Sequence, residues 1–154
     1  MAQSFLTTAL RPELIKPRLQ GTDKDAIIRA LIDVLTSAAA LTDREAPEKA
    51  VFDREKTMST GMENGIAIPH GKTDTVDSLI AAIGLKPEGV DFQCVDGQPA
   101  RILILTLSPA NRSGPHVRFM AGISKLLRDE ETHARLLEAD TPDAILDILT
   151  TPKS

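Results

Sequence analysis

The stretch "ARILILTLS", residues 100–108, is apolar at successive positions, so both alternating faces of a strand would carry apolar side chains. A strand with one face in water would instead alternate between apolar and polar residues. The run therefore predicts an interior strand that is covered on both sides. Helices that pack on both faces of a sheet provide such a cover, and this layering is typical of α/β proteins.

Two further strands are predicted upstream of this run. They are "SLIAAIGL" at residues 78–85 and the shorter "GIAIP" at residues 65–69. Between residues 78–85 and residues 100–108, the dipeptide Asp96-Gly97 is a hairpin turn signal, because both residue types tolerate the positive φ angles of tight turns. We therefore expect these two longer strands to be neighbours in the sheet.

The segment before the strands has the spacing of amphipathic helices. Residues 22–38 predict one helix, with Thr22 as its N-cap and with Asp23 and Asp25 in the first turn, where acidic groups suit the helix dipole. A second helix is predicted over residues 45–56. The first helix would bury one apolar stripe, formed by Ile27, Ile28, Leu31, Val34 and Leu35.

Three more helices are predicted after the last strand. They cover residues 114–129, 130–139 and 141–149. Ser113 is the expected N-cap of the first of them. Thr141 is the expected N-cap of the last, because a proline and an aspartate follow it at the positions that favour a helix start.

The alternation of helices and strands defines the predicted fold class. A chain of 154 residues fits one domain with a full hydrophobic core, and no internal repeat or linker interrupts it. We predict a single α/β domain over residues 1–154, with a mixed, mostly central sheet of about five strands flanked by helices on both faces.

Composition excludes several classes of function. The net charge of -4 and the lack of a lysine and arginine cluster argue against a nucleic-acid binder and against attachment to an anionic membrane. The single cysteine, Cys94, rules out an internal disulfide and a thiolate zinc cluster. No apolar run approaches the roughly 20 residues of a membrane-spanning helix, so the protein is expected to be cytoplasmic.

His70, one of only three histidines, closes the run "GIAIPH". In a continuing strand, Ile66, Ile68 and His70 would point to the same face. Pro69 cannot donate to a sheet ladder and Gly71 permits a sharp turn, so the strand should end here. A rigidly held imidazole at a strand end is well placed to meet a ligand, but a surface histidine in a turn fits the geometry equally well.

Two other side chains can accompany His70 at an anion site. His116 lies in the first turn of its predicted helix, where the dipole favours a bound anion and disfavours an imidazolium. Arg54, near the end of the helix at residues 45–56, offers a fork of donors to a phosphate or a carboxylate. Taken alone, each is explained more simply by a structural role: His116 as a partly buried histidine and Arg54 as a surface cation that offsets the helix dipole.

The remaining candidates are assigned to structural roles. His133 falls in a charged stretch and is predicted to lie on a solvated helix face. Cys94 has no histidine or basic residue beside it in the sequence, so nothing indicates a reactive thiol. A metal site would need His70, His116 and a carboxylate such as Glu63 to converge, and no HExxH spacing is present, so no bound metal is expected.

The stretch "DREKTMSTGMENGIAIPHGK", residues 53–72, resembles the active-site segment of enzyme IIA of the bacterial phosphoenolpyruvate-dependent phosphotransferase system. The resemblance is to the fructose/mannitol class and its nitrogen-regulatory relatives. That family has an Arg-Glu pair, a Ser/Thr-Thr-Gly segment and a Gly-Ile-Ala-Ile-Pro-His run that ends in the phosphorylated histidine. Residues 104–127, "ILTLSPANRSGPHVRFMAGISKLL", are similar to the region that carries the family's second histidine. The resemblance covers nearly the whole chain.

The resemblance implies a phosphotransferase that needs neither a metal nor a nucleotide cofactor. His70 would accept a phosphoryl group from the histidine phosphocarrier protein and pass it to a cysteine of a IIB protein in sugar uptake. His116 would donate a hydrogen bond to the phosphoryl oxygens, and Arg54 would neutralise charge on them. Thr60 would add a hydroxyl donor.

Two details and one alternative complete these expectations. Ile66, Ile68 and Met62 are expected to form an apolar rim that docks partner proteins. Glu63 stands where the family often has glycine or another small residue, so its carboxylate should point away from the phosphoryl group. The alternative function is a nitrogen-regulatory enzyme IIA, which controls target proteins through its phosphorylation state.

Overall fold

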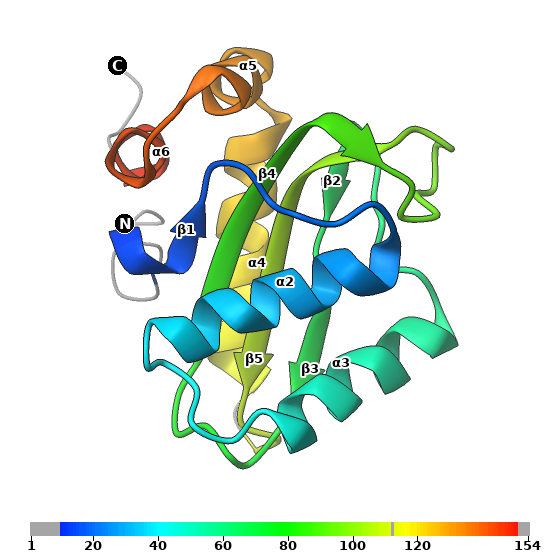
Figure 1. The fold of residues 1–154 in the computed structure, drawn as a ribbon, viewed down its shortest axis with the longest axis vertical. Helices are drawn as coiled ribbons and strands as arrows, with labels where there is room; N and C mark the ends of the chain where they lie inside the picture. Colours follow the sequence, from blue (N-terminus) through cyan, green and yellow to red (C-terminus); the bar gives the residue numbers. More distant parts are fainter. Residues whose placement is uncertain (1–9, 112, 151–154) are drawn as a thin grey trace.

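The computed structural model describes residues 10–111 and 113–150, and Figure 1 shows a sheet between two layers of helices. In chain order the elements are η1 (Pro12–Leu14), β1 (Ile15–Lys16), α2 (Lys24–Ser37), α3 (Glu45–Thr57), β2 (Ile66–Ala67), β3 (His70–Lys72), β4 (Ile80–Val90), β5 (Ala100–Ser108), α4 (Ser113–Arg128), α5 (Glu130–Glu138) and α6 (Pro142–Thr150). Within these ranges, no helix has the length and apolar character needed to cross a lipid bilayer.

The sheet has five strands and is mixed, as predicted. Its order is β1-β4-β5-β2, and β3 also pairs with β5. β4 and β5 are antiparallel, whereas the other pairs are parallel. The predicted turn at Asp96-Gly97 joins β4 to β5, with Gly97 at a φ of 73° and its N–H donating to the carbonyl of Cys94 at 3.0 Å. Pairing stops at Val90 and Ala100, so the connecting loop is longer than a two-residue turn.

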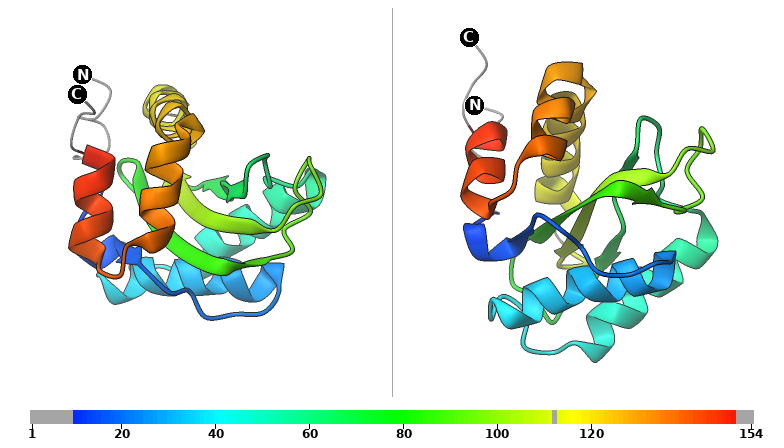
Figure 2. Two further views of the ribbon diagram at one scale, coloured as in Figure 1. Left: turned by 90° about the horizontal axis from the view of Figure 1, so that it is seen from above. Right: turned by 45° about the horizontal axis from the view of Figure 1, so that its top comes forward.

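β5 confirms the prediction of a strand that is buried on both faces. Leu103, Leu105 and Leu107 belong to the apolar cluster that contains the buried stripe of α2. Ile102 and Ile104 belong to the cluster on the opposite face, with the apolar residues of α4, α5 and α6. Figure 2 shows these two groups of helices on opposite sides of the sheet. The strand is therefore the centre of the molecule, and residues at its ends have fixed positions.

Local differences from the predicted helices concern their starts and their buried faces. Asp23, not Thr22, is the N-cap of α2, and its Oδ1 accepts a hydrogen bond from the N–H of Ala26 at 2.8 Å. In the same helix Ile32 is fully buried, whereas Val34 is only partly buried, so the predicted stripe is displaced by part of a turn.

The two helix starts predicted for the C-terminal part have different outcomes. α4 begins at Ser113, and its predicted capping interaction lies outside what the structure describes. Thr141 caps α6 as predicted, with its Oγ1 accepting from the N–H of Ala144 at 3.1 Å.

Of the strand predicted over residues 65–69, only Ile66–Ala67 is formed as β2, and a further short strand, β3, follows at His70–Lys72. Both pair in parallel with β5, but Pro69 lies between them and has no N–H to contribute to the ladder. Its carbonyl still accepts from the N–H of Thr106 at 3.1 Å, so the chain stays beside β5. His70 consequently opens β3, where we had expected it to close a strand.

Candidate functional site

The rings of His70 and His116 lie beside one another at the end of β5. Ile66 and Ile68 pack in the cluster on the α4 side of the sheet, and His70 follows them on the same face. α4 begins just after β5 and carries His116 in its first turn. The two ring centroids are 5.1 Å apart, with 42° between the ring planes. The structure thus brings together two histidines that are far apart in the sequence.

The hydrogen bond of His70 defines which ring nitrogen is reactive. Nδ1 lies 3.0 Å from the carbonyl oxygen of Ile68. A carbonyl oxygen only accepts hydrogen bonds, so Nδ1 carries the proton. In the neutral ring the lone pair then belongs to Nε2, because the bond made by one nitrogen fixes the state of the other. The ring therefore has one bound nitrogen and one nucleophilic nitrogen.

The environment of His116 favours a neutral imidazole. The pKa of His116 is lowered from its ordinary value of 6.5. Burial is the largest cause, and positive charge on His70 and on Lys72 adds to it. Its Nδ1 lies 3.5 Å from Oγ1 of Thr106, at the outer limit of a hydrogen bond. A neutral ring at a helix N-terminus can still donate one hydrogen bond to an anion.

Arg54 lines the same pocket as His70. The pocket has a volume of about 220 Å³, and its lining includes Arg54, Met62, His70, Val95 and Met120. The Nη1 of Arg54 donates to the carbonyl of Met58 at 2.8 Å, which holds the side chain near the end of α3. The same bond to a carbonyl at the helix end also fits the simpler alternative, a cation that offsets the helix dipole, so the structure supports both roles of Arg54.

Thr60 and Glu55 have roles that differ from the predictions. The Oγ1 of Thr60 donates to Oε2 of Glu55 at 2.6 Å, and its N–H donates to Oε1 at 2.8 Å. Both residues are buried. The hydroxyl hydrogen of Thr60 is thus committed to Glu55, and the prediction that it donates to a phosphoryl group is wrong. Reasoning from the sequence gave Glu55 no role, although its place beside Arg54 in the Arg-Glu pair was a signal.

Of the three residues predicted to form the apolar rim, Met62 is exposed and the two isoleucines are buried. Ile66 is 7% exposed and Ile68 is 1% exposed, so neither can dock a partner. Met62 is 40% exposed, as expected for a rim residue, and Val95 is 86% exposed. Two further exposed apolar side chains, Met58 and Val117, lie at the end of α3 and next to His116. Glu63 is also exposed and is not part of the pocket lining.

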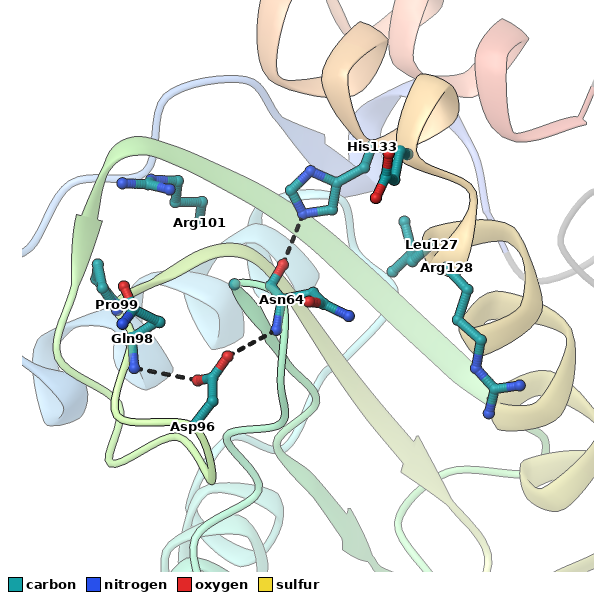
Figure 3. A pocket seen from close by; sticks show the side chains of 10 residues that line it. Asn64, Asp96, Gln98, Pro99, Arg101, Leu127, Arg128 and His133 are labelled. Atoms are coloured by element: carbon teal, nitrogen blue, oxygen red, sulfur yellow. Dashed lines mark hydrogen bonds between the residues drawn. The ribbon is translucent and has the colours of Figure 1, made fainter.

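His133 does not lie on a purely solvated face. Its Nε2 is 2.8 Å from the carbonyl oxygen of Asn64, in the loop that leads into β2 (Figure 3). The N–H of Asn64 donates to Asp96 at 3.1 Å, and the N–H groups of Gln98 and Asn64 hold the pKa of Asp96 below its usual range. These residues line a second cavity, of about 340 Å³, which lies between α5 and two loops. Neither His70 nor His116 lines it.

Cys94 agrees with the structural role predicted for it. The residue is buried, and burial, followed by the charge of Asp96, raises the pKa of its thiol. A thiol in this state is a poor nucleophile. Among the residues that the structure describes, no three histidine, cysteine, aspartate or glutamate side chains gather in a way that could hold a metal ion.

An α/β domain with two adjacent histidines and an arginine at one strand end is suited to the transfer of an anionic group. The sequence model of the family "Phosphoenolpyruvate-dependent sugar phosphotransferase system, EIIA 2" matches residues 8–151, and the chain belongs to that family.

Relatives of known function come from two branches of the family. The fructose-specific EIIABC component of Bacillus subtilis is 37% identical over 94% of this chain, which spans only 23% of that larger protein. The fructose-specific EIIA component of Haloferax volcanii is 33% identical, with 94% of both chains covered. The nitrogen regulatory protein of Bradyrhizobium diazoefficiens is 32% identical over 96% of this chain and 95% of its own length.

Solved structures support the same fold. The nitrogen regulatory protein IIA-Ntr of Neisseria meningitidis superposes with a TM-score of 0.86 at 24% identity, covering 94% of this chain and 99% of that one. The enzyme IIA of the Escherichia coli mannitol system, in its complex with phosphorylated enzyme IIB, superposes with a TM-score of 0.79 at 26% identity, covering 93% of this chain and 98% of that one.

Proposed function

We propose that this protein is a phosphocarrier that accepts a phosphoryl group on His70 from a histidine phosphocarrier protein and passes it to a cysteine of a IIB protein in sugar uptake. The hydrogen bond from Nδ1 of His70 to the carbonyl of Ile68 carries this proposal, because it leaves Nε2 as the nucleophile. A carrier of this kind works in the cytoplasm.

In the first transfer, the lone pair of His70 Nε2 attacks the phosphorus atom. A nitrogen–phosphorus bond forms while the bond to the donor's histidine breaks, and its electron pair returns to the donor's ring. In the second transfer, a cysteine thiolate attacks the phosphorus and the electron pair returns to Nε2. Such transfers depend mostly on positioning and on charge stabilisation, without a metal or a nucleotide.

His116 and Arg54 stabilise the phosphoryl oxygens in this proposal. His116 donates from Nε2, which carries the proton when the hydroxyl of Thr106 donates to Nδ1. Arg54 turns from the carbonyl of Met58 to the equatorial oxygens when the phosphoryl group arrives, since a charged acceptor makes the stronger hydrogen bond. The first role needs no movement of the main chain, and the second needs only a side-chain rotation.

The acceptor is supported by the mannitol enzyme IIA, whose complex with phosphorylated IIB has the same fold on the IIA side. A regulatory role is the second candidate, because a nitrogen regulatory protein is 32% identical over nearly the full length of both chains. The phosphorylation chemistry is common to both, and the two functions differ in the protein that receives or senses the phosphoryl group.

Labelling with phosphoenolpyruvate, enzyme I and the carrier protein tests the proposal. The wild-type protein should acquire acid-labile phosphate, and His70→Ala should acquire none. His133→Ala is a matched control, because it also removes an imidazole, and it should be labelled like the wild type. Persistent labelling of His70→Ala would sink the assignment. Onward transfer to a IIB cysteine would support sugar uptake, whereas phosphorylation without such transfer would support regulation.

A further inference from the structure

Lys24 and Glu55 form an ion pair that is largely withdrawn from solvent. The Nζ of Lys24 lies 2.7 Å from Oε1 of Glu55, and the two side chains are 17% and 5% exposed. Lys24 is the first residue of α2, and Glu55 is in the last turn of α3. By contrast, Lys49 and Asp53 form an ion pair on the exposed surface of α3.

A continuous series of hydrogen bonds leads from this ion pair to the ring of His70. Glu55 accepts the N–H and the hydroxyl of Thr60 at 2.8 and 2.6 Å. The carbonyl of Thr60 accepts the N–H of Ile68 at 3.1 Å. The carbonyl of Ile68 then faces Nδ1 of His70 at 3.0 Å. The side chain of Glu55 is thus connected to the ring of His70 through the main chain of Thr60 and Ile68.

Lys24 places a positive charge beside the buried carboxylate of Glu55. A buried carboxylate that loses its partner either takes up a proton or bears a large desolvation cost. A protonated Glu55 would carry an O–H donor on one oxygen, and that oxygen would be a weaker acceptor for its bond from Thr60. Lys24 is itself held in place, since it donates to Oε1 of Gln93 at 2.9 Å and lies 5.0 Å from the ring centroid of Phe92.

We propose that Lys24 is a positioning residue of the phosphoryl-transfer site: through Glu55, Thr60 and Ile68 it keeps the proton of His70 on Nδ1 and the lone pair on Nε2. Lys24 itself does not touch the phosphoryl group. The role in transfer rests on the proposed function of His70, whereas the effect on the proton position does not.

The test compares Lys24→Met, which removes the charge at similar length, with the conservative Lys24→Arg and with Lys49→Met as a matched control. In Lys24→Met, the single-turnover rate of His70 phosphorylation at saturating donor should fall about tenfold, while the donor concentration for half-maximal rate changes less than about twofold. Lys24→Arg should recover most of the rate, and Lys49→Met should equal the wild type.

The position of the proton is measured separately from ¹⁵N chemical shifts of the His70 ring. The wild type should have the proton on Nδ1, and Lys24→Met should show a mixture of the two tautomers. Should Lys24→Met fail to fold, Thr60→Val replaces it, because it breaks the series at the hydroxyl with little change in shape. A folded variant with wild-type rate and an unchanged tautomer overturns the inference. Wild-type protein that takes up no phosphate overturns the proposed function instead, and the tautomer measurement then still decides the inference.

Discussion

At the scale of single residues, the two histidines at the site have the same side chain but different electrostatic surroundings. Nδ1 of His70 is bound to a main-chain carbonyl, which leaves one defined nucleophilic nitrogen. His116 is half-buried beside two groups that can be positive, and its pKa is lowered. A phosphoryl group on His70 would reverse this effect, because a nearby negative charge favours the imidazolium. His116 can therefore become a stronger donor only after the anion has arrived.

The lowered pKa of His116 predicts a pH dependence of stability. In the unfolded chain the ring has its ordinary pKa near 6.5, so the unfolded state binds the proton more readily than the folded state. The free energy of unfolding should be fully retained above pH 6.5 and should decrease as the pH falls from 6.5 through the lower, folded pKa. Urea unfolding between pH 7.5 and pH 5 should show a smaller decrease for His116→Gln than for the wild type. Equal decreases for both proteins would contradict the lowered pKa of His116 as the cause of the pH dependence.

At the scale of elements, the sequence predicted the regular parts of the fold but not the connections at the site. β5 was predictable because its apolar residues occupy both alternating faces, a property of the strand itself. The roles of Thr60 and Glu55 were not, because their bond joins a helix to a loop and leaves no periodic signal. Arg54 and Glu55 are adjacent in the sequence, yet successive helical residues point about 100° apart. One consequently faces the pocket and the other faces the interior.

The three predicted site residues lie close together in the structure, whereas the surroundings predicted for them differ from those observed. The resemblance selected His70, His116 and Arg54, and the structure places them near one another. Ile66 and Ile68 do not form the expected rim. Alternation along a strand indicates which face a side chain is on, but it does not show whether a helix covers that face. Here the buried residues of α4 belong to the same apolar cluster as both isoleucines, on that face of the sheet.

Gly61 lets the loop before β2 pass close to the β4–β5 connection, and a larger residue at this position should destabilise the fold. A Cβ at this position would lie 2.7 Å from the carbonyl oxygen of Phe92 and 2.9 Å from the Cα of Cys94. Main-chain atoms cannot move aside as a flexible side chain can, so Gly61→Ala should lower the free energy of unfolding by about 1–3 kcal/mol. Chemical denaturation measures this change. Gly114→Ala is the control, since its Cβ would have only an ordinary contact with Arg118, and it should change stability by less than about 1 kcal/mol.

At the scale of the whole molecule, one nitrogen atom has to meet two different proteins. In the proposed function, donor and acceptor both reach Nε2 of His70, so they must use the same surface in turn. Around the pocket that surface carries Met62 and Val95, from the loop before β2 and from the β4–β5 connection. These segments are distant in the sequence and adjacent in the fold. Exposed apolar side chains at such a place are suited to binding proteins and to excluding water.

Val95 is 86% exposed and lines the pocket of His70, so a substitution at this position tests whether the surface around the pocket binds the donor. A charge here should leave the fold intact, and the stability of Val95→Asp should stay within about 0.5 kcal/mol of the wild type. Burying the new carboxylate against a partner without a counter-charge is unfavourable, so the KM for the phosphorylated donor should rise about tenfold. Transfer kinetics with varied donor concentration measure this value. Ala144→Asp adds the same charge on α6 and should leave KM unchanged. If both variants behaved alike, the loss would come from net charge, and the surface around His70 would not be the docking site.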